Sequence, residues 1–237
     1  RLAWRCHFIQ KLEDQPSIET HCMHPAFEGL REKEHREDYF EAWKAGQTGI
    51  PFVDACMRSL ISTGWITFRM RAMLVSFASY QLWLDWRKTA PYLAGLFTDY
   101  EPGIHYSQFQ MQSGVTGINA IRVYNPIKQG LDQDPKGIFV SKWVPELRHI
   151  KGEAIHQPWL QEQTLFTAKS DQKDVTYPTP IVDLTLSAKA AKDKLAAVRK
   201  SEAFFMNKNA VHIRHGSRKR AAKSKSQNPK PNQLKLF

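Results

Sequence analysis

Hydrophobic residues recur along most of the chain with the spacing of helices, and the alternation typical of strands is not sustained anywhere. In the segment 69–84, Met70, Met73 and Phe77 fall on one helical face. Most of that helix is therefore expected to be buried, together with Arg69 and Arg71. The pattern predicts an all-α fold. Further helices are expected over residues 1–13, 52–61, 90–97, 104–112, 138–144 and 186–205.

The ends of these segments indicate how the chain is organised. Gly64 follows the helix over 52–61 and is expected to end it, while residues 113–137 and 163–182 are rich in Gly, Pro and polar residues, which favours loops. The first helix has no capping residue before it and no initiating Met, so we expect the chain to be the C-terminal part of a longer protein. We predict a helical domain over residues 1–210 and a disordered basic tail over residues 211–237.

Composition excludes several classes of protein. Hydrophobic residues make up 42% of the 237 residues and aromatic residues 11%, which suffices for a buried core. No apolar run approaches the length of a membrane span and no signal-peptide pattern opens the chain, so a soluble cytoplasmic protein is expected. Cys6, Cys22 and Cys56 are widely spaced without a CxxC pair, which favours reduced, mostly buried thiols over disulfides or a four-cysteine metal site.

Positive charge is concentrated at the C-terminal end. Between Arg214 and Phe237 there are eight Lys and Arg residues and no acidic residue, which leaves only +3 of the formal charge of +11 for the residues before them. Such a basic tail favours salt-sensitive attraction to nucleic-acid phosphates. A disordered terminus without a partner is the alternative.

The segment 63–114 places arginines, acids and a histidine among aromatic side chains, and these are groups that hold a large, charged, planar cofactor. A buried guanidinium needs an anionic partner, and Asp99 and Glu101, in the acidic turn before Pro102, are the candidates. An internal salt bridge without a ligand is the alternative.

Common catalytic and metal-binding motifs are absent, since the sequence has no Walker loop, GxGxxG, GxSxG or HExxH. His21, Cys22 and His24 lie close together, but three neighbouring ligands without a distant fourth rarely close a metal site, and we expect them to be surface residues near Pro25. His105, taken alone, is more typical of a satisfied core histidine than of a catalyst.

Several motifs in order, TGWITFRMR, LDWR, DYEP and RVYNPIKQGLDQDPKGIFVSKWVPEL, resemble the FAD-binding domain of the DNA photolyase and cryptochrome family, over residues 1–180. The resemblance implies an all-helical domain that binds FAD in a U shape beside a DNA-docking cavity and uses blue light to drive electron transfer to a damaged pyrimidine pair. It also implies an N-terminal antenna domain outside this chain, whose pigment, if any, the sequence does not identify.

The resemblance assigns cofactor contacts residue by residue. Arg71 matches an arginine that pairs with an aspartate near the isoalloxazine ring, and His105 takes the place beside flavin N5 where photolyases commonly carry Asn. This exchange of an amide for an imidazole leaves the redox and protonation behaviour of the flavin open. A fold of this family that has lost its cofactor is the alternative. The positions that match the cofactor site are Arg5, Trp65, Arg71, Asp99, Tyr100, Glu101 and His105.

The resemblance to lesion-binding positions is more mixed. A Trp at a cavity wall has a physical role because stacking offsets part of the cost of extruding a base, although core packing would also account for Trp4. Arg1 stands where cyclobutane-dimer photolyases place Glu, Phe68 where they place Asn, and Ala72 where they place Met, so the lesion type is not transferable. The positions that match DNA or lesion contacts are Trp4, Arg69, Gln129 and Met111, the last in place of a second Trp.

The electron route of the family is incomplete in this sequence. Of the three tryptophans that the family often uses, only the middle one, Trp86, is evident, because Phe109 replaces the one nearest the flavin and residues 33–36 supply no outer one. Phenylalanine is much harder to oxidise, so electrons for photoreduction would need another aromatic side chain. The candidates are Trp83, Tyr80 and Tyr106.

The last five residues, QLKLF, resemble the peptide that bacterial replication and repair proteins insert into the sliding clamp. Leu236 and Phe237 would fill an apolar pocket and Gln233 would hydrogen-bond to its rim, with the preceding tail as a tether. The residues expected to bind the clamp are Gln233, Leu234, Leu236 and Phe237.

These features favour the FAD-binding domain of a bacterial, light-dependent DNA repair enzyme, a carbon–carbon lyase that acts on a pyrimidine photoproduct in damaged duplex DNA. One alternative is a cryptochrome-type photoreceptor without repair activity. The other is a flavin-free adaptor that binds DNA and the sliding clamp. Neither a membrane nor a metal is an expected partner.

Overall fold

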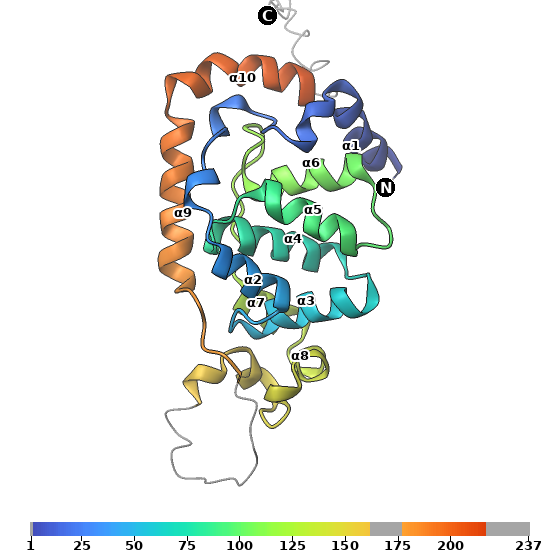
Figure 1. Ribbon diagram of the computed structural model, residues 1–237, viewed down its shortest axis with the longest axis vertical. Coiled ribbons are helices and arrows are strands. Elements are labelled where there is room, and N and C mark those ends of the chain that lie inside the picture. The colour runs from blue at the N-terminus through green and yellow to red at the C-terminus, as the bar shows by residue number, and fades with distance from the viewer. Residues whose placement is uncertain (1, 162–176, 217–237) are drawn as a thin grey trace, which may run out of the picture.

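The computed structural model describes residues 2–161 and 177–216, and every regular element in these residues is helical (Figure 1). The predicted all-α fold is confirmed. Short 3₁₀ turns connect several of the α-helices. The α-helices are α1 Leu2–Asp14, α2 Glu37–Ala45, α3 Pro51–Thr63, α4 Phe68–Ser76, α5 Trp86–Leu96, α6 Pro102–Ser113, α7 Pro126–Gln133, α8 Ile138–Trp143, α9 Leu184–Arg199 and α10 Glu202–His215.

Helices α3 to α6 form the centre of the molecule. α3 is buried from Pro51 to Leu60 except at Arg58, and it ends at Gly64 as predicted. α4 continues into a fully buried π-helical turn, Phe77–Gln81. α4, α5 and α6 lie side by side, and α1 packs along α6 (Figure 1). This arrangement brings α4, α6 and the α5–α6 connection together around one space.

Capping side chains fix where several helices begin. Thr67 accepts a hydrogen bond from a first-turn amide of α4, and Asp85 does so at α5. Each oxygen satisfies a backbone donor that the first turn of a helix leaves free. The same device corrects the sequence-based loop over 113–137, because Asn125 caps α7 and Pro126 occupies its first position.

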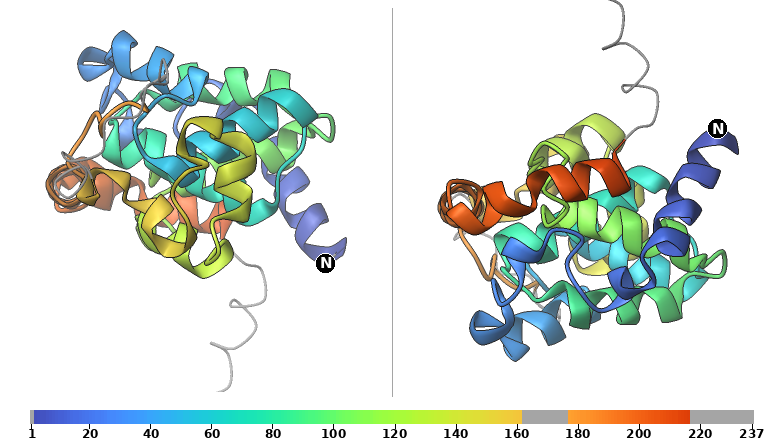
Figure 2. Two further views of the ribbon diagram at one scale, coloured as in Figure 1. Left: turned by 90° about the horizontal axis from the view of Figure 1, so that it is seen from below. Right: turned by 90° about the horizontal axis from the view of Figure 1, so that it is seen from above.

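The single helix expected over residues 186–205 is two helices. α9 ends at Arg199, and the Ser201 side chain accepts from Phe204 N to start α10. α9 runs along one side of the molecule and α10 turns across its end (Figures 1 and 2). α10 continues to His215, so helical structure extends past residue 211, where the tail was expected to begin; residues 217–237 lie outside the described residues.

A buried carboxylate fixes the segment after Tyr177 to the start of α3. Asp54, which has no exposed surface, accepts hydrogen bonds from Thr48 N (2.9 Å), Thr48 Oγ1 (2.6 Å), Gly49 N (3.1 Å) and the Tyr177 hydroxyl. Ile181 N also donates to Thr48 O at 3.0 Å. Four donors compensate for the desolvation of the carboxylate, so this segment is held in place as it leads into α9.

Other expectations from the sequence concern the thiols and the His21–His24 segment. Cys6 is exposed, and Cys22 and Cys56 are buried free thiols. The expectation of surface residues is wrong for Cys22 and His24, because both are buried and the His24 ring stacks on Phe204 at a centroid distance of 4.3 Å.

Residues 2–161 and 177–216 contain no group of three or more His, Cys, Asp or Glu side chains that could hold a metal. In the same residues, no helix has the length and apolar character needed to cross a membrane.

Candidate functional site

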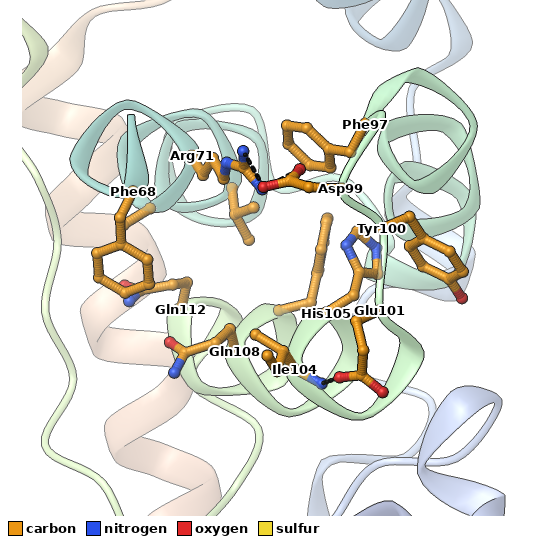
Figure 3. Close-up of a pocket in the computed structure, with 13 residues that line it drawn as sticks. Phe68, Arg71, Phe97, Asp99, Tyr100, Glu101, Ile104, His105, Gln108 and Gln112 are labelled. Atoms are coloured by element: carbon orange, nitrogen blue, oxygen red, sulfur yellow. Dashed lines mark hydrogen bonds and ion pairs between the residues drawn. The ribbon is translucent and has the colours of Figure 1, made fainter. Parts of the chain in front are cut away.

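A cavity of about 150 Å³ lies between α4, α6 and the connection that precedes α6 (Figure 3). α4 supplies one wall with Phe68 and Ala72, and α6 supplies the facing wall with Ile104 and Phe109. Residues 97–101 close one end. The cavity brings together most of the residues expected to hold the cofactor, namely Arg71, Asp99, Tyr100, Glu101 and His105.

An ion pair forms one edge of the cavity. Arg71 Nη1 lies 2.9 Å from Asp99 Oδ1, and Arg71 Nη2 donates to Asp99 Oδ2 at 3.0 Å. Arg71 Nε donates to Ile66 O at 3.0 Å, and the guanidinium lies 4.2 Å from the centre of the Phe97 ring. This bidentate geometry fixes both side chains. The Asp99 side chain remains 51% exposed, so its oxygens keep lone pairs for a ligand.

Arg69 lies two residues before Arg71 but differs in environment. It is exposed, so the prediction that both arginines enter the core with the helix is wrong for Arg69. The fully buried guanidinium in the described residues is Arg31, which donates to the backbone oxygens of Ser79 (3.0 Å) and Ser113 (2.9 Å) and packs 4.3 Å from the Trp83 ring. Burial lowers the pKa of Arg31 to about 10.

Glu101 positions α6 rather than pairing with an arginine. Its Oε1 accepts from Gly103 N at 3.2 Å and its Oε2 accepts from Ile104 N at 2.7 Å. A carboxylate at this position satisfies free first-turn donors and also interacts favourably with the helix dipole. The sequence offered Asp99 and Glu101 as candidate partners of a buried arginine, and the structure gives that part to Asp99 alone.

His105 is a neutral histidine in an aromatic environment. Its Nε2 lies 2.9 Å from Ala90 O, and its ring contacts those of Tyr100 and Phe109 at 5.3 Å between centroids. Burial lowers the pKa of His105 to about 4, and the positive charge of Arg71 acts in the same direction. Because a carbonyl oxygen only accepts, Nε2 carries the proton of the neutral ring and Nδ1 is left as an acceptor.

Replacing His105 with asparagine should make unfolding less sensitive to acid. With a pKa of about 4 when folded and 6.5 when unfolded, this histidine takes up its proton in the unfolded state first, so stability falls as the pH drops from 6.5 towards 4. The variant should recover on the order of 2 kcal/mol of that loss, after allowance for partial solvent access. Urea unfolding at pH 7 and pH 4.5 measures this. His215, whose pKa is also lowered to about 4, remains in the variant, so part of the sensitivity should persist. If the free energy of unfolding falls between pH 7 and pH 4.5 by the same amount in the variant as in the wild type, a buried neutral imidazole at position 105 is contradicted.

The remaining predicted residues lie outside the cavity lining. Arg5 and Trp4 are exposed on α1, with Trp4 at 66%, so packing in the core does not account for Trp4. Trp65 is also exposed, in the connection between α3 and α4. Met111 and Gln129 are half-buried, and the Gln129 side-chain oxygen has no hydrogen-bond partner among the described residues. Their roles in cofactor or DNA binding stay predictions.

The aromatic residues considered for electron transfer differ in their relation to the cavity. Phe109 lines it, and Trp86 is buried at the start of α5. Tyr106 contacts the His105 ring at 5.2 Å between centroids, whereas Trp83 lies between Arg31 and Lys194. Of the alternative candidates, Tyr106 is thus in direct contact with a residue of the cavity.

Two glutamines, Gln108 and Gln112, line the cavity and were not identified from the sequence (Figure 3). They follow His105 at positions i+3 and i+7 of α6, which is the spacing of one helical face. Once His105 is assigned to the site, this spacing alone could have found them.

Known proteins share the sequence and fold of this chain and identify its family. Residues 1–197 match the family described as the FAD binding domain of DNA photolyase, and the chain belongs to that family. Its curated relatives include both photolyases and cryptochromes. The deoxyribodipyrimidine photo-lyase of Streptomyces griseus is 36% identical over 185 residues, which cover 78% of this chain and 39% of that protein. Cryptochrome DASH of Danio rerio is 41% identical over 144 residues, which cover 60% of this chain and 28% of that protein.

Solved structures agree with the sequence comparison. The archaeal photolyase from Sulfolobus tokodaii, crystallised with two FAD molecules, superposes with a TM-score of 0.73 at 32% identity, over 83% of this chain and 43% of that one. The class III photolyase from Agrobacterium tumefaciens gives a TM-score of 0.72 at 30% identity, over 84% and 42%. The chain therefore spans about two fifths of the length of these photolyases. The resemblance seen in the sequence is confirmed at the level of the family and of its FAD-binding fold.

Proposed function

We propose that this chain is the FAD-binding part of a light-dependent DNA repair flavoprotein, which transfers an electron from reduced FAD to a pyrimidine photoproduct. The observation that carries the proposal is the cavity, whose lining combines a bidentate Arg71–Asp99 pair, a neutral histidine and aromatic side chains. Bound FAD supplies one-electron chemistry, and the protein supplies position and electrostatics.

Each cavity residue has a distinct part in this proposal. Asp99 would offer hydrogen-bond acceptors to a bound ligand, and Arg71 places a fixed positive charge beside Asp99, which favours an electron-rich ligand. His105 has no second proton to donate at neutral pH, so its Nδ1 acts as an acceptor. Phe97 and Phe109 add apolar surface to this end of the cavity, against which a planar ring could pack.

Damaged duplex DNA is the proposed partner. Trp4 and Phe68 present exposed aromatic rings, at 66% and 62%, that could stack on an extruded base, and Arg69 offers an exposed charge. The basic residues after Arg214 would add salt-dependent attraction to phosphate. The name of the Streptomyces griseus relative, a deoxyribodipyrimidine photo-lyase, supports the same substrate class.

A repair assay tests the function directly. The full-length protein, loaded with FAD, is mixed under blue light and in darkness with ultraviolet-irradiated oligo(dT) annealed to oligo(dA), and intact thymine is followed by chromatography. Repair that needs both light and flavin is the expected result. Flavin binding with light-driven flavin reduction but no repair would contradict repair and support the cryptochrome-type alternative. That alternative is favoured by the apolar Phe68 and Ala72 in the cavity wall and by the cryptochrome DASH relative. Binding of DNA without any flavin would support the adaptor reading.

The sliding clamp is proposed as a second partner, through the C-terminal QLKLF. Residues 233–237 lie outside the described residues, so the support is the sequence alone. Deleting these five residues should abolish binding to a bacterial clamp in a pull-down while flavin content stays the same. Equal clamp binding by the shortened protein would remove this part of the proposal.

A further inference from the structure

Three glutamines alternate along the second half of α6, and they differ sharply in environment. Gln110 has no exposed surface and its side chain is fully used, since Oε1 accepts from Met23 N at 2.6 Å and Nε2 donates to Ile18 O (2.7 Å) and His21 O (2.8 Å). Gln110 therefore has a structural role, which ties the segment 18–23 to α6.

Gln108 and Gln112 have the opposite environment. They are four residues apart, so they lie on one face of α6, and both line the cavity (Figure 3). The Gln108 side-chain oxygen is buried without a hydrogen-bond partner, and Gln112 is only 7% exposed yet its amide bonds to none of the described residues. Leaving a buried acceptor unpaired is costly, so the Gln108 oxygen, with the unpaired amide of Gln112 on the same helical face, indicates a ligand that completes their hydrogen bonds in the cavity.

The chemistry of this end of the cavity restricts the ligand. Figure 3 places Gln108, Gln112 and Phe68 away from the Arg71–Asp99 pair, so among the described lining residues no charged side chain lies beside the two amides. Phe68 and Ala72 form an apolar wall opposite them, which suits a planar ring. A side-chain amide offers one acceptor and two donors, and it pairs in bidentate fashion with a neutral ring edge that presents a donor beside an acceptor.

We propose that Gln108 and Gln112 bind the imide edge, O=C–NH–C=O, of a planar ring in this cavity and select for it. This edge occurs in the isoalloxazine ring of a flavin and in thymine, so the same chemistry has two possible sources within the proposed function, on which the inference rests. The positions at Phe68 and Ala72 offer no polar group to such an edge, and the two glutamines of the facing helix supply that polarity instead.

Two binding measurements on the full-length protein tell whether the two glutamines bind the flavin ring or the pyrimidine of the DNA. The double variant Gln108→Leu/Gln112→Leu removes both amides with little change in volume, and Gln133→Leu, at an exposed position of α7, is the matched control. Affinity for FAD is measured by fluorescence quenching, in parallel with a flavin methylated at N3, which lacks the imide N–H. Affinity of the FAD-loaded protein for ultraviolet-irradiated oligo(dT) is then measured by anisotropy, and circular dichroism checks that each variant is folded.

The outcomes decide the inference. A loss of about tenfold or more in FAD affinity in the double variant, with no such loss for the N3-methyl flavin, assigns the amides to the flavin edge. Unchanged FAD affinity with a similar loss for irradiated oligo(dT) assigns them to the pyrimidine edge. Wild-type affinity for both ligands in the folded double variant overturns the inference and leaves the proposed function standing. A wild-type protein that binds neither ligand overturns both.

Discussion

Replacing Arg71 with alanine should weaken FAD binding roughly ten- to hundredfold. The substitution removes the bidentate partner of Asp99, which is also the only Lys or Arg among the described residues that line the cavity, and it leaves the carboxylate uncompensated beside the ligand. Fluorescence titration of the purified full-length protein with FAD measures the effect. The FAD affinity of Arg71→Lys should lie between those of the wild type and Arg71→Ala. An ammonium keeps the positive charge but loses the planar guanidinium, which donates to both Asp99 and Ile66 O.

The control for this experiment is Arg122→Ala, which removes a guanidinium at an exposed position outside the cavity lining. It should bind FAD like the wild type. If Arg71→Ala also binds FAD like the wild type, the Arg71–Asp99 pair is an internal salt bridge and the ligand lies elsewhere.

Replacing Gly49 with alanine should destabilise the fold by about 3 kcal/mol. Gly49 has φ of +77°, which disfavours any side chain, and a Cβ there would lie 2.2 Å from Thr179 O and 2.5 Å from Pro180 N. Because these are backbone atoms, relief requires the segment 177–183 to move off α3, with loss of the Ile181 N to Thr48 O hydrogen bond. Urea unfolding at pH 7 measures the change in free energy.

A variant at a second glycine distinguishes the cost of a positive φ from the cost of the steric clash. Gly152 also has a positive φ, +66°, but a Cβ there would meet no atom within 4 Å. Gly152→Ala should therefore cost only the backbone term, about 1 kcal/mol. Equal losses in the two variants would show that the contact between Gly49 and the backbone at Thr179 contributes nothing to stability.

Local signals in the sequence predicted the central helices well. The apolar residues of α3 and Gly64 after it define a helix with its end, and the structure agrees. The break between α9 and α10 was missed because residues 186–205 keep a helical composition across it, and only the Ser201 cap marks the boundary. α7 was missed for the opposite reason, since Gly and Pro around it indicated a loop while Asn125 and Pro126 are in fact starting signals.

Within the functional site, too, some residues could be predicted from local signals in the sequence and others could not. Arg71 and Asp99 are 28 residues apart; the chemistry of the sequence offered Asp99 and Glu101 as partners of a buried arginine, and the resemblance to a known family singled out Arg71 and Asp99. Helical periodicity does not tell which of two neighbouring arginines turns inward, so Arg69 was predicted buried although it is exposed. Gln108 and Gln112 carry no motif at all. Their spacing from His105 places them on the same face of α6 as that residue, but only the position of α4 across the cavity shows that this face borders a cavity.

The most direct test of the central claim is the visible absorption spectrum of the purified full-length protein, recorded after FAD is added and the excess removed, and again under blue light with a reductant. We expect flavin bands that stay with the protein and bleach on illumination, since the cavity would hold the ring and its surroundings favour the electron-rich form. A protein that emerges without flavin, while folded and able to bind DNA, would contradict it.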